Sequence, residues 1–135
     1  MEVTKRDIET LARTIYGEAR GENEDGLLAV AHVVMNRAER GGWWGSTIDE
    51  VCRHPHQFSC WNEADPNREK LLAIDADDPV ARDCLWAALA VVQGKHPDNT
   101  SGSFHYHASH AAPDWAQGKT AVGTIGNHLF YNDVD

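Results

Sequence analysis

The sequence predicts an α+β fold in which a mainly helical body and a small antiparallel β-sheet flank a cleft. Two observations carry this prediction. Apolar residues recur at three- and four-residue spacings along the first part of the chain, whereas from Phe104 onward apolar and polar residues alternate. Helices therefore come first and strands last, an order typical of α+β domains. The length of 135 residues suits one domain, predicted to span residues 1–135.

The first predicted helix carries an apolar stripe that runs from Ile8 through Leu11 to Ile15. Thr4, followed three residues later by Asp7, supplies an N-terminal cap in which Asp replaces the usual Glu of a capping box. We therefore expect this helix to begin directly after Thr4.

A second helix is predicted over residues 25–40, where apolar residues are so dense that the helix should lie in the middle of the core. The glycine pair at 41–42 ends it. Thr47, with Glu50 three residues later, opens a short helix toward Cys52.

Residues 53–68 contain prolines and many polar groups and are predicted to form an ordered loop. Asp78 followed by Pro79 marks the start of a helix that a glycine stops after residue 93. The segments 104–108 and 125–131 are short and rich in aromatic or β-branched residues, so they are predicted to pair as two antiparallel strands.

Glu18 is the residue that indicates chemistry most directly. Continuing the first helix at about 100° per residue places Glu18 roughly 20° from Leu11, at the edge of the buried stripe. Gly17 and Gly21 weaken the helix on either side of it. A carboxyl group half lined by apolar groups resists ionisation, because desolvation disfavours its charged form. It can then deliver a proton as a general acid, for example to the leaving-group oxygen of a glycosidic bond. The alternative is an ordinary surface ion pair with either of two neighbours, Arg13 or Arg20.

The composition argues against two classes of partner. The formal net charge is −9, with 21 acidic residues against 12 basic ones, so no basic stripe is left for a nucleic acid. No apolar run approaches the roughly 18 residues that a membrane span needs. The charged segment 2–7 does not read as a signal peptide, so we expect synthesis in the cytoplasm and action elsewhere only after release. Some tryptophans lie in loop-like stretches where a sugar ring could stack, half of them expected to be structural instead: Trp43, Trp44, Trp61 and Trp115.

Cysteine usage leaves two alternatives open. Cys52 and Cys60 could close a short disulfide loop in an oxidising compartment. With His54 and His56 they could instead supply four zinc ligands, although the spacing differs from the usual paired pattern.

Histidines of the strand segments offer a second metal hypothesis. His105 and His107 share one face of their strand, and His128 from the neighbouring strand could complete a zinc site with a metal-activated water. Hydrogen bonding by these imidazoles is the favoured interpretation, because no carboxylate or Cys at fixed spacing completes the ligand set. We therefore predict no metal ion and no other cofactor.

Six short motifs follow one another along the chain: IYGEARGE at 15–22, AVAHVVMNR at 29–37, QFSCWN at 57–62, FHYHA at 104–108, PDWA at 113–116 and IGNHLFY at 125–131. Each motif alone is weak, but six in this order are specific. Together they resemble the cell wall hydrolase family of the spore cortex-lytic enzyme SleB and its phage relatives, over nearly the whole chain. The resemblance implies a lysozyme-like domain that acts on the glycan strands of peptidoglycan.

Members of this family are regarded as lytic transglycosylases, and the acid of the motif Y-G-E-A-R-G-E maps onto Glu18. The resemblance implies that Glu18 protonates the oxygen between N-acetylmuramic acid and N-acetylglucosamine. It then accepts the proton of the muramic 6-hydroxyl, and a 1,6-anhydro sugar forms. Glu22, in the same motif, is predicted to be a catalytic auxiliary that orients substrate or tunes Glu18, with helix capping as its alternative role.

A muramidase that uses water is an alternative reaction, and it would usually need a second carboxylate about 5 to 9.5 Å from the first. The candidates near Glu18 or after the aromatic loop are Glu22, Glu24, Asp25, Glu63 and Asp65.

Amide, hydroxyl and aromatic side chains suited to sugars are predicted to bind the substrate. One wall of the cleft is assigned to Gln57, Phe58, Ser59, Trp61 and Asn62, with Tyr16 from the first motif. The opposite wall is assigned to Tyr106, His107, His128 and Tyr131.

The chain is short compared with the spore enzymes, which favours a phage-type endolysin that acts as a monomer and that a membrane-breaching partner delivers to the wall. Two other functions remain as alternatives. One is a zinc amidase that cuts the peptide stem through His105, His107 and His128. The other is a non-catalytic glycan-binding module.

Overall fold

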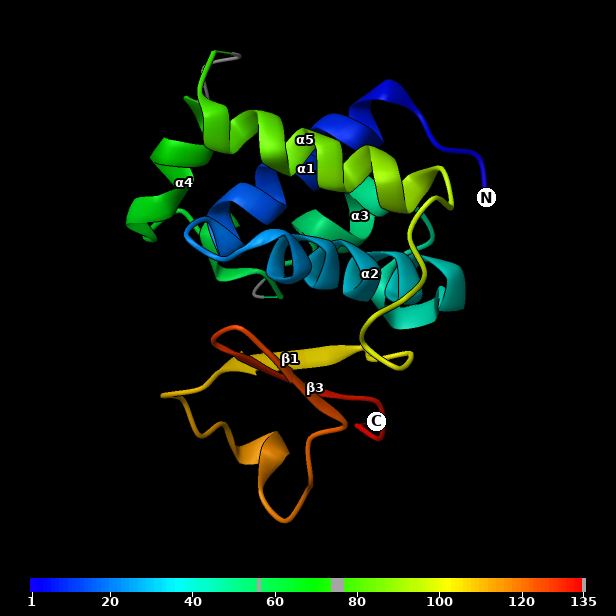
Figure 1. The fold of residues 1–135 in the computed structure, drawn as a ribbon, viewed down its shortest axis with the longest axis vertical. Coiled ribbons are helices and arrows are strands. Elements are labelled where there is room, and N and C mark those ends of the chain that lie inside the picture. The colour runs from blue at the N-terminus through cyan, green and yellow to red at the C-terminus, as the bar shows by residue number, and fades with distance from the viewer. Residues whose placement is uncertain (56, 74–76, 135) are drawn as a thin grey trace.

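The computed structural model describes residues 1–55, 57–73 and 77–134. Within these ranges, helices precede three strands along the chain (Figure 1). The α-helices are α1 (Lys5–Ala19), α2 (Glu24–Arg40), α3 (Ile48–Arg53), α4 (Pro66–Leu72) and α5 (Pro79–Val92). Short 3-10 helices are η1 (Gly42–Trp44), η2 (Ser59–Trp61) and η3 (Asp114–Ala116), and the strands are β1 (His105–Ala108), β2 (Gly123–Ile125) and β3 (His128–Tyr131). This order confirms the predicted α+β fold.

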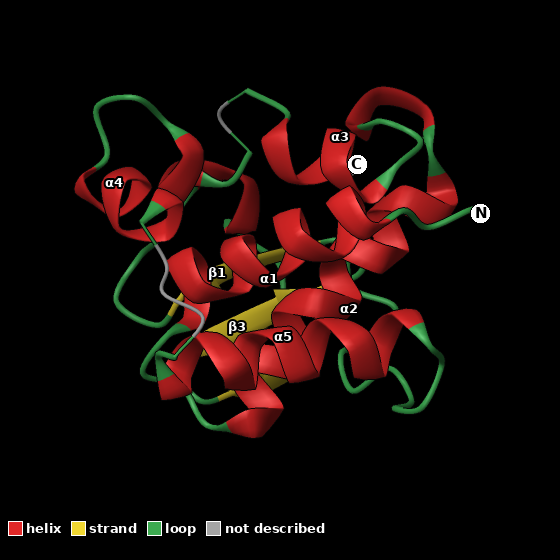
Figure 2. Ribbon diagram, turned by 90° about the horizontal axis from the view of Figure 1, so that it is seen from above, coloured by secondary structure: helices red, strands yellow, loops and turns green. Residues whose placement is uncertain are grey.

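Helices α1, α2, α3 and α5 pack around a shared apolar core, and we call residues 5–92 the helical body. Leu11 and Ile15 of α1 are fully buried, as are Val30 and Val34 of α2. Figure 2 shows α1, α2 and α5 lying side by side over the strands. Helix α2 therefore has the central position that its dense apolar sequence predicts, because a helix that is apolar on most sides is stable only when those sides are buried.

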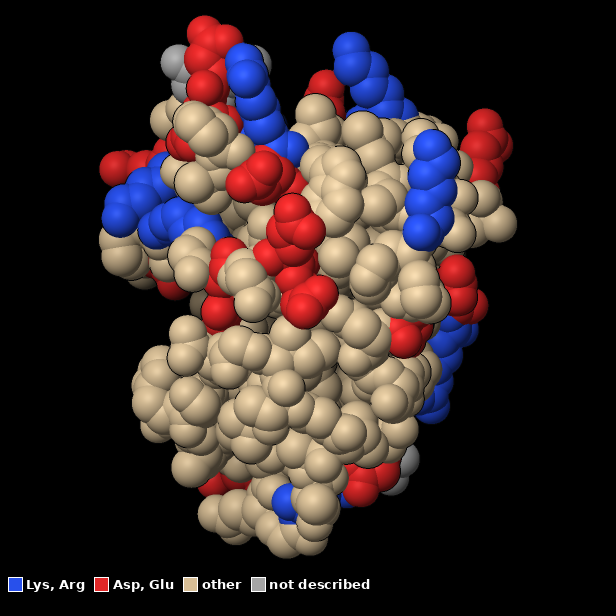
Figure 3. Space-filling model, in the orientation of Figure 1, with Lys and Arg blue, Asp and Glu red and all other residues tan. Residues whose placement is uncertain are grey.

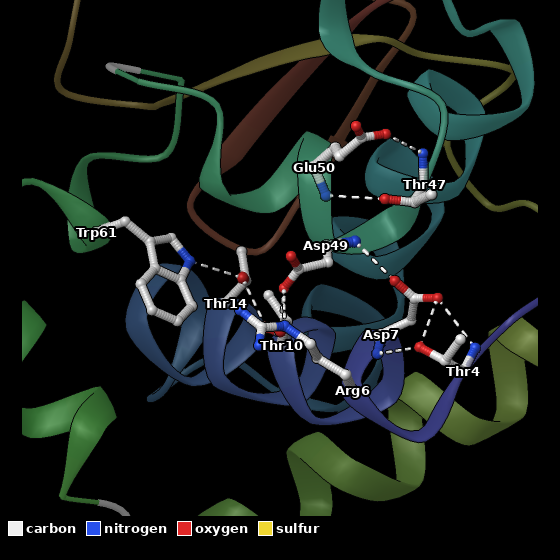
Figure 4. Close-up of polar contacts among 9 residues, drawn as sticks. All are labelled: Thr4, Arg6, Asp7, Thr10, Thr14, Thr47, Asp49, Glu50 and Trp61. Carbon is white, nitrogen blue, oxygen red and sulfur yellow. Dashed lines mark hydrogen bonds and ion pairs between the residues drawn. The ribbon is translucent and has the colours of Figure 1, made fainter.

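Polar contacts of Asp7 join the start of α1 to the start of α3 (Figure 4). The Asp7 carboxylate accepts hydrogen bonds from the Thr4 N–H and, through its other oxygen, from the Asp49 N–H, each at 2.9 Å. The two predicted capping pairs, Thr4 with Asp7 and Thr47 with Glu50, are both formed. Because Asp7 is only 4% exposed, these bonds are shielded from water and fix the two helix starts relative to each other.

A helix begins inside the segment that the sequence analysis predicts to be a loop. The loop prediction for residues 53–68 is wrong at its end, because α4 starts at Pro66. Asp65 caps α4 by accepting a hydrogen bond from the Asn67 N–H at 2.8 Å, just as Asp78 caps α5. Proline at a helix start has the φ that the helix needs and leaves no N–H unpaired. The overlooked signal is therefore the Asp-Pro pair itself.

The sheet has the strand order β1-β3-β2, with both neighbouring pairs antiparallel. The predicted antiparallel pairing of 104–108 with 125–131 is thus correct and corresponds to β1 and β3, but the third strand, β2, begins before the second segment and is not predicted. Gly126 lies in the tight turn between β2 and β3 with φ +57, a left-handed conformation that glycine adopts without strain. The turn folds β2 back along β3 and widens the sheet.

A small apolar cluster joins the sheet to the helical body. Phe130 of β3 is fully buried against Ala29 and Val33 of α2, with Tyr106 and Ile125 packed beside it. In Figure 1 the sheet accordingly lies below the helices, on the side of α2. This cluster fixes the inner face of the sheet next to the helices and brings Tyr106 within reach of α1.

Charged side chains are unevenly spread over the molecule (Figure 3). They are dense over the helical body, whereas residues 104–131, which we call the sheet region, contain only Asp114 and Lys119 among the four charged residue types. In the part of the chain that the structure describes, none of the helices has the length and apolar character to cross a membrane.

Candidate active site

A cavity of about 490 Å³ opens where the end of α1 meets the sheet region, and we call it the Glu18 cavity. It is the cleft that the sequence predicts between helices and sheet. Its described lining residues are Gly17, Glu18, Arg37, Gln57, Phe58, Ser59, Asn67, Tyr106, His107, Ala108, His110 and His128. Glu18 is the only carboxylate among these described residues. Acid or base chemistry by a carboxyl group in this cavity therefore falls to Glu18.

Glu18 lies in the last turn of α1, one residue before the helix ends at Ala19, and it is partly buried. Its Oε1 accepts a hydrogen bond from the Tyr106 hydroxyl at 2.7 Å, and its Oε2 accepts a longer one from the Cys60 N–H at 3.4 Å. None of the ion pairs among the described residues involves Glu18, and Arg20 instead donates to the Tyr16 carbonyl and to Asn67. The carboxyl group is thus fixed by neutral donors. Its catalytic role stays a prediction.

Tyr106 connects the sheet region to Glu18. It lies on β1 opposite Phe130, and its ring contacts the His128 ring with centroids 4.9 Å apart. Burial, together with the neighbouring Glu18 carboxylate, raises the pKa of Tyr106 well above its usual range. The phenol therefore keeps its proton at neutral pH and can donate it in the hydrogen bond to Glu18.

Glu22 lies in the chain between α1 and α2 and binds the β2–β3 turn. Its Oε1 accepts a hydrogen bond from the Asn127 N–H at 3.0 Å, and its side chain is 11% exposed. A Cβ at Gly126 would lie 2.5 Å from Glu22 Oε2, so only glycine fits there with the carboxylate in place. Glu22 does not line the Glu18 cavity. Its geometry suits a residue that positions the sheet turn, and its predicted role as an auxiliary stays a prediction.

Two histidines of the sheet, His107 and His128, line the cavity. Burial lowers the pKa of His128, and the nearby carboxylates of Glu22 and Glu18 only partly oppose this effect. His107 donates from Nδ1 to the Ala108 carbonyl at 2.7 Å, and its Nε2 lies 2.9 Å from the Tyr131 hydroxyl. Both rings therefore contribute hydrogen-bonding groups to the cavity, and burial disfavours a charge on His128.

Arg37 is a cavity residue that the sequence analysis does not assign. It is 5% exposed, its Nε donates to the Phe104 carbonyl at 2.7 Å, and its guanidinium lies over the rings of Trp44 and Phe58. Its Nη1 is buried and has no hydrogen-bond partner among the described residues. The burial of Arg37 could have been predicted from the sequence, because Arg37 follows Val30 by seven residues and so lies on the buried face of α2.

The structure brings some predicted substrate-binding residues to the cavity and not others. Gln57, Phe58, Ser59, Tyr106, His107 and His128 line it, together with the unassigned Asn67 and His110. The other four are not among the described lining residues, and each forms a hydrogen bond with another residue: Tyr16 with Asp78, Trp61 with Thr14, Asn62 with Ser59, and Tyr131 with His107. The substrate-binding roles of all ten stay predictions.

The three-histidine zinc hypothesis is wrong, because of the strand register. His128 pairs with Ala108, and directly paired residues of an antiparallel sheet point to the same face. His128 therefore shares the face of Tyr106, while His105 and His107 point to the other face, where both rings contact Trp115. Within the described ranges, no group of three or more His, Cys, Asp or Glu residues is arranged to hold a metal ion.

The structure also bears on the two hypotheses for Cys52 and Cys60, a disulfide bond and a zinc site. Cys52 and Cys60 are free and buried, and burial raises the pKa of the Cys52 thiol to about 12, which disfavours the thiolate that zinc binds. His54 contacts the Trp43 ring, with centroids 4.5 Å apart. His56, the fourth member of the proposed ligand set, lies outside the described residues.

Solved structures share this fold. The catalytic domain of the germination-specific lytic transglycosylase SleB from Bacillus anthracis superposes with a TM-score of 0.71 at 24% identity, covering 94% of each chain. The catalytic domain of the Bacillus cereus SleB protein gives a TM-score of 0.72 at 24% identity, covering 96% of this chain and 91% of that one. These likenesses confirm the predicted lysozyme-like fold.

Curated relatives agree. The spore cortex-lytic enzyme of Oceanobacillus iheyensis is 27% identical over 127 residues, which are 94% of this chain and 42% of the relative. That of Bacillus subtilis is 26% identical, over 94% of this chain and 38% of the relative. The chain thus spans less than half the length of these relatives.

A family model described as Cell Wall Hydrolase matches residues 21–131. The match begins after Glu18, so the assignment of Glu18 depends on the geometry of its cavity and on the motif that contains it. The matched range covers most of the chain, and the resemblance that the six motifs predict is confirmed: the chain belongs to the Cell Wall Hydrolase family.

Proposed function

We propose that this protein is a lytic transglycosylase that cleaves peptidoglycan glycan strands between N-acetylmuramic acid and N-acetylglucosamine. One observation carries the proposal: Glu18 is the only carboxylate that lines the cavity between the helical body and the sheet, among the described residues. Family membership and the fold shared with the Bacillus anthracis lytic transglycosylase support it.

Glu18 acts first as an acid and then as a base. Its carboxyl proton passes to the bridging oxygen while the bond between that oxygen and C1 of the muramic acid breaks. The carboxylate then accepts the proton of the 6-hydroxyl of the same sugar, whose oxygen bonds to C1. The products are a 1,6-anhydromuramic end and a free 4-hydroxyl on the N-acetylglucosamine, so Glu18 regains its proton and no water is consumed.

Neighbouring groups orient the Glu18 carboxyl group and bind the substrate. The hydrogen bond from Tyr106 to Oε1 leaves Oε2 to exchange the proton with the sugar. Amide and hydroxyl groups of Gln57 and Ser59 line the same cavity and can bind the N-acetyl and hydroxyl groups of the substrate. Glu22 holds the β2–β3 turn through Asn127 and so acts on the site through the sheet.

A single carboxylate favours internal attack over hydrolysis. Hydrolysis with inversion or retention uses a second carboxylate on the other side of the bond, as general base or nucleophile. Glu24 and Asp25 are exposed and are not among the described residues that line the cavity. The 6-hydroxyl of the substrate removes the need for such a group.

Glu18→Gln tests the proposal, with Glu24→Gln as the matched control because Glu24 is exposed outside the cavity. We expect the Glu18→Gln variant to fold normally and to lose at least about 10³-fold in the release of soluble fragments from purified sacculi. The control should retain full activity. A Glu18→Gln variant with normal activity would exclude the mechanism, and binding without release by the wild type would favour a glycan-binding module.

Mass spectrometry of the digested strands distinguishes the two reactions. Anhydro ends are lighter than reducing ends by one water, so a digest with reducing ends alone would establish a muramidase instead. Monomeric action and delivery as a phage-type endolysin also stay proposals. Sedimentation of the protein tests the first, and lysis by cytoplasmic expression with and without a membrane-permeabilising protein tests the second.

A further inference from the structure

Two more cavities continue the Glu18 cavity along the junction of helices and sheet. One, of about 430 Å³, shares Arg37, Gln57 and Tyr106 with the Glu18 cavity and is also lined by Trp115; we call it the Trp115 cavity. The other, of about 620 Å³, shares Trp43 and His105 with the Trp115 cavity and extends to Gly41 and Gly42. Because each cavity shares lining residues with the next, the three lie next to one another in a row, and we call this row the groove.

Trp43 presents a large apolar face at the far part of this groove. Its side chain is 67% exposed, whereas the adjacent Trp44 is 8% exposed and stacks on Phe104. His54 supports the Trp43 ring, with centroids 4.5 Å apart. An exposed tryptophan gives up the hydrophobic stabilisation of burial, so an indole that is held by a neighbouring ring and exposed at a groove is typical of a binding site.

Arg37 supplies an unused donor where the Glu18 and Trp115 cavities meet. Its buried Nη1 has no hydrogen-bond partner among the described residues, although the side chain is 5% exposed. An unpaired buried donor is costly, and an oxygen of a ligand in the groove can relieve that cost. The ring of His105 next to it is neutral, because burial lowers the pKa of His105 to about 4 with help from Arg37 and Arg40.

We propose that this groove binds two further sugars of the glycan strand on one side of the scissile bond. With the bond above Glu18, the first sugar on that side lies in the Glu18 cavity and the second in the Trp115 cavity, where Arg37 donates to one of its oxygens. The third sugar stacks on Trp43. The inference rests on the proposed function, and it explains why a groove lined by aromatic rings and by the cations Arg37 and Arg40 continues beyond the reacting carboxyl group.

Substrates of defined length test the third position. The tetrasaccharide that alternates N-acetylglucosamine and N-acetylmuramic acid, beginning with N-acetylglucosamine, contains one cleavable bond with two sugars on each side. It fills the Glu18 and Trp115 cavities, so it touches only the part of Trp43 that lines the Trp115 cavity and leaves the third position, on the exposed face of that ring, empty. The corresponding hexasaccharide has a bond with four sugars on whichever side the groove takes, so it reaches Trp43.

We expect Trp43→Ala to lower kcat/KM on the hexasaccharide about tenfold more than on the tetrasaccharide, mainly through KM. Trp86→Ala is the matched control, because Trp86 is also exposed, at 46%, but lies on α5 and does not line these cavities. It should leave both substrates unchanged. Equal losses on the two substrates, or no loss on the hexasaccharide, would overturn the inference.

Binding gives a second readout that does not need turnover. The N-acetylglucosamine hexamer, which has neither peptide nor lactyl group, should bind the Glu18→Gln variant at least about tenfold more tightly than the Glu18→Gln, Trp43→Ala double variant. Equal affinities would overturn the inference. If instead the wild type releases no fragments from sacculi, the proposed function fails, and this result is separate from both length-dependent outcomes.

Discussion

The helical body and the sheet region contribute opposite kinds of chemistry to one cavity. The body carries nearly all the charged side chains and supplies the carboxyl group of Glu18 (Figure 3). The sheet region is nearly free of Asp, Glu, Lys and Arg, and it supplies the neutral donor Tyr106, the imidazoles of His107 and His128, and aromatic rings. The comparison teaches that the two hydrogen bonds to the Glu18 carboxyl group come from neutral donors, and that the shorter one comes from a distant part of the chain.

The two regions are also built differently. Helices of the body begin at caps formed by residues two or three positions apart, such as Thr4 with Asp7. The sheet region instead depends on contacts between residues far apart in sequence, such as Glu22 with Asn127 and Tyr106 with Glu18. Damage to the body should therefore cost stability first, whereas damage to the sheet region should cost activity.

The largest effect is expected from Asp7→Ala in the body. It removes the acceptor for the N–H groups of Thr4 and Asp49, so we expect a loss of about 3 kcal/mol in the free energy of unfolding by urea titration. Asp7→Asn keeps the shape and one acceptor oxygen and should lose less. Well below the melting temperature, kcat should stay normal, and a fall in kcat with the fold intact would break the comparison.

Gly126→Ala should cost about 2 kcal/mol, because it combines a left-handed φ with a clash against Glu22 Oε2. Gly118→Ala is the control, since Gly118 also has a left-handed φ of +75 but a Cβ there meets nothing within 4 Å. The control should lose about 1 kcal/mol in thermal denaturation and keep its activity. Unlike the control, Gly126→Ala should also lose activity; equal behaviour of the two variants would show that Glu22 does not position the turn.

Tyr106→Phe removes the hydroxyl that binds Glu18 Oε1 and keeps the ring. We expect kcat to fall about tenfold, equivalent to about 1.4 kcal/mol, with little change in stability. Tyr131→Phe removes a hydroxyl that binds His107 instead and should cost clearly less kcat. If the two variants lose kcat equally, the bond to Glu18 has no special role.

The smallest effect concerns pH. His105 has a pKa of about 4 in the folded protein against an ordinary value of 6.5, so the unfolded chain binds more protons between these values. Stability should therefore fall as the pH is lowered from about 6.5 to 4. The ring is partly exposed, so His105→Gln should flatten that slope by only about 1 kcal/mol in denaturant titrations at several pH values. An unchanged slope would contradict the assigned cause.

The sequence predicts the body better than the sheet region, for a physical reason. The caps at Thr4, Thr47 and Asp78 act over a few residues, and the structure forms all three. The face of His128 depends instead on its pairing with Ala108, twenty residues away along the chain, which alternation within one strand does not specify.

The structure differs from the sequence prediction at two further places, the start of α4 and the location of Arg37. The start of α4 at Asp65-Pro66 is visible in the local sequence, in the same form as at Asp78-Pro79, and the prediction of a loop overlooks it. The location of Arg37 between two cavities is not visible there, because it requires β1 to be placed against α2 through Phe104.

The connection between β1 and β2, residues 109–122, lies below the sheet in Figure 1. Its Trp115 lines the Trp115 cavity. None of the hydrogen bonds that hold Glu18 comes from this segment among the described residues. Under the proposed function, grafting a different connection here would change a surface that contacts the glycan while the hydrogen bonds to Glu18 stay in place. The proposed glycan contacts of Trp115 and the proposed acid are thus carried by separate segments of the chain.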